Sequence, residues 1–393
     1  MPPSSSSVSF DVLVIGAGLV GASFALALRG SGLRVGVVEP SPPAPQSDTW
    51  DSRIYALNPA SVDFLQSLGA WSALDAARVQ AVARMDIHGD ALDSRLSFSA
   101  YETGVAALAH IVESGRLQHA LWQALGAASN VEVISAARCV AVQFEPDEAV
   151  LNLDDGRTLR AALLVGADGA NSWLRRASGL HTEAQPYEAL GVVANFECER
   201  AHDGTAFQWF RADGILAYLP LPDARMSVVW STPQAHGREL LDLPPERLAA
   251  RVAEAGRHVL GKLRVITPPQ AFPLQKLRVP NIVAPRVALI GDAAHVVHPL
   301  AGQGVNLGFG DAQTLARHIV ERESFRACGD MVVLRRYQRS RAEPVAAMRV
   351  MTHTLQRLFA ARSPALSAIR NRGLSRVDRA GPFKNLLVRQ ALG

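Results

Sequence analysis

Cysteine and long apolar runs are scarce in this chain of 393 residues. It has three cysteines, Cys139, Cys198 and Cys328, and no two of them have C-x-x-C spacing. This number argues against a disulfide scaffold and a cysteine zinc site, and it favours a reducing cytosol. No apolar run approaches the roughly 18 residues that would cross a bilayer. Residues 1–9 lack the positive charges of a signal peptide. These absences predict a cytoplasmic protein.

Charge is sparse and its two signs are unevenly distributed. The formal net charge is +4, yet residues 335–393 carry 13 Lys and Arg against two acids, which leaves −7 on residues 1–334. A basic segment of this kind is typical of contact with an anionic surface such as the inner membrane. It is equally typical of a solvated helix face. Nucleic-acid binding is not expected, because the segment has no recognisable module and no aromatic stacking platform.

The first forty residues have the pattern of a nucleotide-binding βαβ unit. The apolar run at residues 11–15 predicts a buried strand, and a second apolar run ends at Glu39. Between them, three glycines lie where strand turns into helix: Gly16, Gly18 and Gly21. They permit a tight turn, close approach of a pyrophosphate and close helix packing, and the helix N-terminus offers free N–H groups. A carboxylate at Glu39 suits ribose hydroxyls and would repel a 2′-phosphate, so FAD or NAD is predicted.

Two later aspartates also follow apolar runs. Asp168 comes after residues 163–166, and Asp292 comes after residues 287–290. At the carboxyl edge of the same sheet, Asp292 can accept hydrogen bonds from the ribityl hydroxyls of a flavin, which NAD lacks. The alternative for Asp292 is to cap a helix that starts at Ala293. Further along, Gly302 and Gly304 precede a helical stretch, so that backbone N–H groups cluster at the start of a helix. Such a cluster suits the negative charge of a reduced flavin.

The middle of the chain has a different pattern. Short β-rich runs alternate with polar or Gly/Pro turns and predict a mostly antiparallel sheet, with strands at residues 190–197, 206–211, 214–220 and 225–231. Their aromatic side chains suit either core packing or a flat binding surface. From residue 312 onward the pattern is helical, with expected breaks at Pro344, Pro364 and Pro382.

The run HPLAGQGVNLGFGD, residues 298–311, resembles the signature of the FAD-dependent hydroxylases of ubiquinone biosynthesis, relatives of para-hydroxybenzoate hydroxylase. Asp168 with Gly169 resembles the family's DG motif, and Gly291 with Asp292 its GD motif. The resemblance implies an α/β fold in which a Rossmann-like FAD-binding domain carries an inserted, mostly antiparallel β-sheet substrate domain. The expected divisions are residues 8–72, 98–182 and 277–345 for FAD, 73–97 and 183–276 for substrate, and a basic helical segment at 346–393.

The resemblance also implies a tightly bound FAD, with NAD(P)H as a transient co-substrate. The cofactor-binding residues that it implies are Gly16, Gly18, Gly21, Glu39, Arg53, Arg116, Gln118, Asp168, Gly169, Asp292, Gly302, Gln303, Gly304, Val305 and Asn306. Pro299 would lie over the reaction side of the ring. His295 and His298 are candidate general bases, and structural hydrogen bonding is their alternative role. No metal is expected, since the histidines include no H-x-x-x-H pair.

The implied reaction is flavin monooxygenation of a polyprenylated phenol intermediate of ubiquinone biosynthesis. NAD(P)H reduces FAD, O₂ forms a flavin C4a-hydroperoxide, and its distal oxygen passes to the phenol ring. One alternative substrate is a small soluble aromatic acid, whose carboxylate would need an arginine such as Arg211 or Arg225. Another alternative is a non-catalytic flavoprotein subunit of a ubiquinone-biosynthesis complex. The sequence leaves open the ring position, the prenyl length, the choice of NADH or NADPH, and the oligomeric state.

Overall fold

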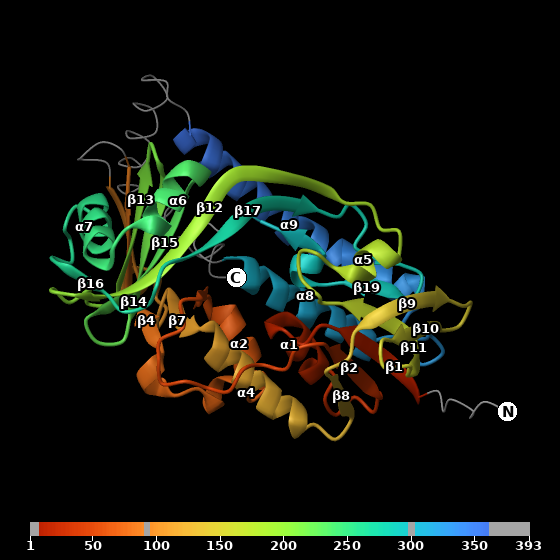
Figure 1. Cartoon of the computed structure of the whole chain (residues 1–393). Coiled ribbons are helices and arrows are strands. Elements are labelled where there is room, and N and C mark those ends of the chain that lie inside the picture. Colours follow the sequence, from red (N-terminus) through yellow and green to blue (C-terminus); the bar gives the residue numbers. More distant parts are fainter. Residues whose placement is uncertain (1–7, 90–94, 298–302, 361–393) are drawn as a thin grey trace.

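The computed structural model describes residues 8–89, 95–297 and 303–360. The described strands form three sheets, of eight, nine and three strands. Figure 1 shows the parallel sheet and the antiparallel sheet as two separate bodies, joined by the long strands β12 (Glu183–Cys198) and β17 (Gln270–Arg278). This arrangement confirms the predicted α/β class, a Rossmann-like sheet with an inserted antiparallel sheet.

The eight-stranded sheet has a parallel centre. Its main order is β18–β19–β11–β1–β2–β8, and the hairpin of β9 and β10 extends it from β11. The five central strands run parallel to one another, and β18 is antiparallel to β19. The strands are β1 (Val8–Ile15), β2 (Val35–Glu39), β8 (Val131–Ser135), β9 (Cys139–Phe144), β10 (Ala149–Leu153), β11 (Thr158–Gly166), β18 (Val283–Ala284) and β19 (Val287–Leu289).

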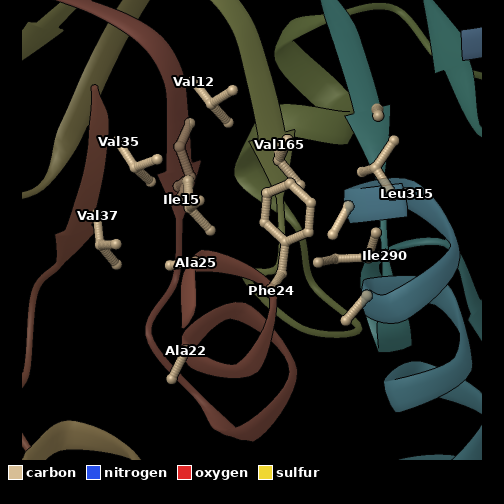
Figure 2. Packing of buried hydrophobic residues seen from close by; sticks show 14 of the residues in the cluster. Val12, Ile15, Ala22, Phe24, Ala25, Val35, Val37, Val165, Ile290 and Leu315 are labelled. Carbon is tan, nitrogen blue, oxygen red and sulfur yellow. The ribbon is translucent and has the colours of Figure 1, made fainter. Parts of the chain in front are cut away.

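Helices bury both the sheet and one another. The helices packed here are α1 (Leu19–Ala27), α4 (Ser114–Gly126), α5 (Trp173–Ala177), α8 (Gln303–Val320) and α9 (Met331–Ala360). Figure 2 shows Phe24 of α1 between Val165 of β11 and Ile290, with Leu315 of α8 beside them. Because the central strands are covered on both faces, they need the continuous apolar runs that the sequence has.

The expected break at Pro344 is wrong, because α9 continues through this residue. A proline inside a helix costs about 3 kcal/mol. The preceding turns are anchored in the core, where the Tyr337 hydroxyl donates to the carbonyl oxygen of Leu289 (2.8 Å) and Arg341 pairs with Asp311. These buried contacts fix the helix up to the turn before the proline. Pro364 and Pro382 lie outside the described residues.

The nine-stranded sheet is antiparallel except where β13 pairs with β5. Besides β12 and β17 it contains β5 (Arg84–His88), β6 (Arg95–Ser99), β13 (Thr205–Arg211), β14 (Gly214–Leu221), β15 (Arg225–Pro233), β16 (Leu263–Val265) and β20 (His295–Val296). Helices α6 (Gln234–Asp242) and α7 (Pro245–Ala255) cover one face over a core that includes Trp209, Tyr218 and Trp230.

A small third sheet lies against the other face of the nine-stranded sheet. It consists of β3 (Ile54–Leu57), β7 (Ala109–Glu113) and β4 (Gln80–Val82), and the sequence analysis did not anticipate it. Its Ile54, Val82 and Ile111 share one apolar cluster with Leu219 and Leu221 of β14. Helix α2 (Pro59–Ser67) follows β3, and the short helix α3 (Ala100–Thr103) follows β6. The segment around β3 therefore lies between the two larger sheets.

Candidate functional site

The glycine turn after β1 is built by two close backbone approaches. Gly16 has a φ of +99°, and a Cβ there would lie 2.6 Å from the carbonyl oxygen of Ala167. A Cβ on Gly21 would lie only 2.0 Å from the carbonyl oxygen of Gly16. By contrast, nothing lies within 4 Å of a Cβ on Gly18, at the start of α1. Two glycines thus serve packing, and the third leaves the helix N-terminus open to a phosphate.

Side chains from β2 and α4 hold the peptide group between these glycines. The N–H of Ala17 donates to Oε2 of Glu39 (2.7 Å), and its carbonyl oxygen accepts from Nε1 of Trp122 (2.8 Å). The other oxygen of Glu39 accepts from the N–H of Ser41 (3.0 Å). Gln118 lies four residues before Trp122 on α4, hence on the same helix face. The predicted contacts Glu39 and Gln118 are thus both placed beside the glycine turn.

The parallel register brings the DG motif to the same sheet edge. The N–H of Ala167 donates to the carbonyl oxygen of Ile15 (2.8 Å), so Asp168 emerges next to the glycine turn. Its Oδ2 accepts from the N–H groups of Trp173 (2.6 Å) and Leu174 (3.1 Å). Its Oδ1 is buried and has no hydrogen-bond partner among the described residues. One oxygen therefore fixes α5, and the other remains available to a ligand.

The GD motif follows the neighbouring strand. The N–H of Ile290 donates to the carbonyl oxygen of Gly166 (3.0 Å), and Gly291 turns with a φ of +60°. The Asp292 side chain is open to solvent on one side and surrounded by protein on the others. This crowding raises the pKa of its carboxyl, although nearby His295 and Arg53 act against the rise. The capping alternative is wrong, because residues 291–293 form a single 3₁₀ turn before β20 and no α-helix begins at Ala293.

A fully buried carboxylate, Asp311 of α8, fixes this turn from behind. Its Oδ2 accepts from the N–H of Gly291 (3.0 Å), and its Oδ1 accepts from Nε of Arg341 (2.6 Å). Nε2 of His295 also lies 2.7 Å from Oδ2 of Asp311. The two atoms are within ion-pair distance, but the angle between them is not that of a ring N–H hydrogen bond. Burial would raise the pKa of Asp311, but the charges of His295 and Arg341 outweigh it and hold that pKa below its usual range. This geometry favours the structural role for His295.

Helix α8 contacts the glycine turn directly. A Cβ on Gly308 would lie 2.6 Å from Cγ2 of Val20 on α1 and 3.3 Å from Cα of Gly291. Stretches of chain some 280 residues apart thus share one ligand-sized edge of the sheet. Nothing lies within 4 Å of a Cβ on Gly304, in the first turn of α8. Val305 is half-buried against the core, and Gln303 is the first residue of α8.

Asn306 connects α8 to the third sheet. Its Nδ2 donates to the carbonyl oxygen of Ala56 (2.9 Å), and its Oδ1 accepts from the N–H of Asn58 (3.1 Å). Both ends of the Asn306 amide thus bind the backbone of residues 56–58. Asn306 would therefore influence a bound flavin ring indirectly, by fixing the position of residues 56–58. Three further predicted residues lie outside the described residues: His298, Pro299 and Gly302.

Arg116 lines a cavity of about 330 Å³ beside Gln118 and the loop of residues 43–51. Its Nε donates to buried Glu113 (3.1 Å), and its guanidinium also donates to the carbonyl oxygen of Ser47 (3.2 Å). Glu113 binds Arg78 through both oxygens as well. Arg53 is exposed and directly precedes β3, and its guanidinium lies over the rings of Tyr55 and Phe272. A second cavity, of about 380 Å³, lies between β13 and the end of α7 and includes none of the predicted cofactor residues.

Sequence reasoning missed Arg175 and Tyr55. Buried Arg175 donates to the carbonyl oxygens of Ala293 (2.8 Å) and Ala170 (2.6 Å), which links the DG and GD segments, and burial lowers the pKa of its guanidinium. Tyr55 lies close enough to Asp292 to sense its charge, and burial raises the pKa of its hydroxyl. The position of Arg175, seven residues after Asp168, was a weak signal. Its partners are carbonyl oxygens, which no sequence pattern reveals.

The hydrogen-bond donors and acceptors at this edge of the parallel sheet fit a flavin dinucleotide. It offers open N–H groups at Gly18, an unpartnered buried oxygen on Asp168 and a solvent-facing carboxylate on Asp292. A diphosphate needs N–H donors, and a polyhydroxyl chain needs carboxylate acceptors. Within the described ranges, no group of three His, Cys, Asp or Glu side chains could hold a metal ion. No helix in the described part of the chain is long and apolar enough to cross a membrane.

Comparison with known proteins decides the family. The family model described as an FAD binding domain matches residues 9–352. The chain belongs to this family of FAD-dependent monooxygenases. It is 36% identical to the 3-demethoxyubiquinol 3-hydroxylase of Escherichia coli (strain K12) over 98% of both chains. It is 32% identical to the ubiquinone hydroxylase UbiL of Rhodospirillum rubrum, over 98% of this chain and 89% of that one.

A solved structure agrees with this assignment. The crystal structure of PqsL from Pseudomonas aeruginosa matches with a TM-score of 0.77 and 26% identity, over 94% of this chain and 100% of that chain. FAD is thus the cofactor of this monooxygenase, and the expected fold, enzyme class and cofactor are confirmed.

Proposed function

We propose that this FAD-dependent monooxygenase hydroxylates a polyprenylated phenol intermediate of ubiquinone biosynthesis, with NAD(P)H as reductant and O₂ as oxidant. The observation that carries the proposal is the relation along nearly the whole chain to one protein named for hydroxylating 3-demethoxyubiquinol and to another named as a ubiquinone hydroxylase. The described residues supply the cofactor edge that such a reaction needs. When bound, FAD supplies the redox chemistry and the activation of oxygen.

The protein's own contribution is binding and orientation. In this proposal the N–H groups around Gly18 would hold the diphosphate, Asp292 would accept from the ribityl chain, and the first turn of α8 would offer N–H groups to the negative charge of a reduced ring. Asp311 and Arg175 keep the GD turn in place through the backbone of Gly291 and Ala293. The chain thereby fixes the ring at the carboxyl edge of the parallel sheet.

A small aromatic acid is less well supported as substrate. Arg211, nominated to bind its carboxylate, already pairs with Asp213 (2.7 Å) and donates to the carbonyl oxygen of Ala255 beneath α7 (2.9 Å). Arg225 pairs with Asp223 (2.5 Å). A substrate carboxylate would therefore have to compete with an existing carboxylate at either arginine, whereas a phenol with an apolar tail needs no such cation.

The direct test uses the purified FAD-loaded protein with detergent-solubilised prenylphenols, NADH or NADPH, and heavy-oxygen-labelled O₂. We expect phenol-dependent NAD(P)H consumption and a product that carries one labelled oxygen atom. Several ring-substitution patterns in parallel identify the position hydroxylated, and the precursor that accumulates in cells without the protein checks the answer. Consumption only with small aromatic acids would favour the alternative substrate. No phenol-dependent consumption would favour a non-catalytic subunit.

The membrane surface is the proposed partner, because a polyprenyl substrate resides there. Part of the excess charge of +11 beyond residue 334 is already paired, since Arg341 binds Asp311 and Arg336 binds Glu323. Residues 361–393 lie outside the described residues, but they carry seven Lys and Arg against one acid, or +6, and this charge suits anionic lipid headgroups. Deletion after Ala361 should reduce co-sedimentation with vesicles that contain anionic lipid and leave the bound flavin unchanged. Equal sedimentation of both forms would show that the segment is only a solvated surface.

A further inference from the structure

Three consecutive residues, Asp51, Ser52 and Arg53, each contact the nine-stranded sheet at a different point. The carbonyl oxygen of Asp51 accepts from Nδ2 of Asn195 on β12 (2.8 Å). The hydroxyl of Ser52 donates to Oε1 of Gln270 on β17 (2.9 Å). The guanidinium of Arg53 lies over the ring of Phe272, also on β17, at 5.5 Å from its centroid. We call residues 51–53 the clamp segment.

The clamp segment is also bound to the start of α4. The N–H of Asp51 donates to the buried Glu113 (2.8 Å), and Oδ2 of Asp51 accepts from the N–H of Gly115 (2.9 Å). The carbonyl oxygen of Arg53 accepts from the N–H of Ser114 (2.9 Å). Since α4 carries Gln118 and Trp122 towards the glycine turn, the segment joins the nine-stranded sheet to the cofactor edge.

Asn195 is the buried member of these contacts. Its side chain is fully buried, and its backbone N–H donates to Oγ1 of Thr267 (2.8 Å), so its position on β12 is fixed. Gln270 and Phe272 are exposed, and water competes for their contacts. A buried amide that donates to a carbonyl oxygen is costly to break, because both groups then lose their partner. Asn195 therefore determines the placement of the clamp segment more strongly than the two exposed contacts.

We propose that Asn195 is a positioning residue for FAD: by holding the carbonyl oxygen of Asp51, it orders the clamp segment and places Arg53 beside Asp292 at the cofactor edge. In this way a strand of the nine-stranded sheet contributes to flavin affinity without touching the flavin. The proposal depends on FAD binding and not on the identity of the phenol. A negative result in the hydroxylation assay would therefore leave its test unaffected.

Ser227 provides a matched control. It faces Asn195 in register across β12 and β15 and is equally buried, yet its hydroxyl has no hydrogen-bond partner in the described part of the chain. Substituting Ser227 by Ala removes a buried polar atom from the same sheet position without removing a contact to the clamp segment. Both variants thus perturb the same strand pair, and only one perturbs the clamp.

The experiment measures the dissociation constant of FAD by fluorescence titration of the apoprotein, together with the melting temperatures of apo and holo forms. For Asn195→Ala we expect FAD binding weakened about tenfold, as for the loss of one buried hydrogen bond. The difference between holo and apo melting temperatures should fall as well. Ser227→Ala should bind FAD like the wild type. Unchanged FAD affinity in Asn195→Ala with a lowered apo melting temperature would overturn the proposal, as would equal weakening by Ser227→Ala.

If Asn195→Ala fails to fold, the partly buried contact between Ser52 and Gln270 is tested next. Ser52→Ala and Gln270→Leu each remove this second tie of the clamp segment, and Gln270 is exposed, where folding tolerates change. Each should weaken FAD binding severalfold, and the double variant should bind no worse than either single one, because both remove the same hydrogen bond. Wild-type FAD affinity in both single variants would show that the Ser52–Gln270 tie is dispensable. Asn195→Leu, which is close in size and lacks the donor, then decides, and wild-type FAD affinity in that variant would overturn the proposal.

Discussion

The glycine turn after β1 and the GD turn after β19 lie at the same sheet edge but are stabilised in opposite ways. The glycine turn depends on missing side chains, since Gly16 and Gly21 approach other backbone atoms more closely than any Cβ allows. The GD turn depends on a buried charge, since Asp311 binds the N–H of Gly291 and is itself held by Arg341 and His295. The first is local in sequence, and the second is assembled from residues up to 50 positions apart.

This difference teaches where each turn is vulnerable. A close backbone approach is insensitive to pH and salt but does not tolerate an added methyl group. A buried ion pair loses much of its stabilisation when one partner is removed or neutralised, because the other charge is left without compensation. The two turns should therefore respond differently to substitution and to acid.

Loss of Arg341 should have the largest effect. Arg341→Met leaves the buried Asp311 carboxylate without its arginine partner, and we expect a loss of about 3–5 kcal/mol in the free energy of unfolding. Urea denaturation of the apoprotein measures this loss. Arg336→Met is the matched control on the same helix, because Arg336 pairs with Glu323 at the surface (2.6 Å) and its loss should cost at most about 1 kcal/mol. Equal losses in the two variants would contradict the role given to Asp311.

An added methyl group in the glycine turn should come next. In Gly21→Ala the Cβ meets the carbonyl oxygen of Gly16 at 2.0 Å, so the backbone must move, and we expect a loss of about 3 kcal/mol in unfolding free energy. Gly18→Ala meets nothing within 4 Å and should change stability by at most about 0.5 kcal/mol. It should instead weaken FAD binding in a titration, because the methyl group faces the open helix N-terminus. If Gly18→Ala lowers stability as much as Gly21→Ala, the two glycines do not have separate roles.

The same contrast explains what could be predicted from sequence. The run GAGLVG and the acid at Glu39 were sufficient for the first turn, because every part of it lies within one βαβ unit. The GD motif predicted where Asp292 emerges. It did not predict the two arginines that hold this turn from distant helices, Arg341 through the carboxylate of Asp311 and Arg175 through the carbonyl oxygen of Ala293. The third sheet was also missed, since β3, β4 and β7 are short and come from three separate parts of the sequence. Local motifs predicted the cofactor edge, and long-range buried polar contacts were not predictable.

Removal of the Asp292 carboxylate should affect binding rather than folding. Asp292→Ala loses a charged acceptor, worth about 1.5–3 kcal/mol, so we expect FAD to bind about 10–100-fold more weakly and the protein to purify with little flavin. Apoprotein stability should not fall, because crowding already raises the pKa of this carboxyl and thus disfavours its charged form. Absorbance of the purified protein and urea denaturation check both statements. A variant with a full complement of flavin would contradict the assignment.

Acid should distinguish the two aspartates of the GD turn, with the smallest effect. The pKa of Asp311 is lowered in the folded protein, so its stabilisation is complete above the ordinary aspartate pKa of about 3.9 and is lost as pH falls through the lower folded value. The pKa of Asp292 is raised, so its unfavourable charge is relieved as pH falls through that higher value. Below about pH 4, Asp311→Asn should therefore flatten the decline in apoprotein stability. Between about pH 4 and the higher folded pKa of Asp292, Asp292→Asn should instead remove the gain in stability that falling pH gives the wild type. Gly21→Ala is the control: it should lower the whole profile of apoprotein stability against pH without altering its slope, since the glycine turn loses no charge. Identical slopes in all three variants would show that the GD turn is not held by a buried charge.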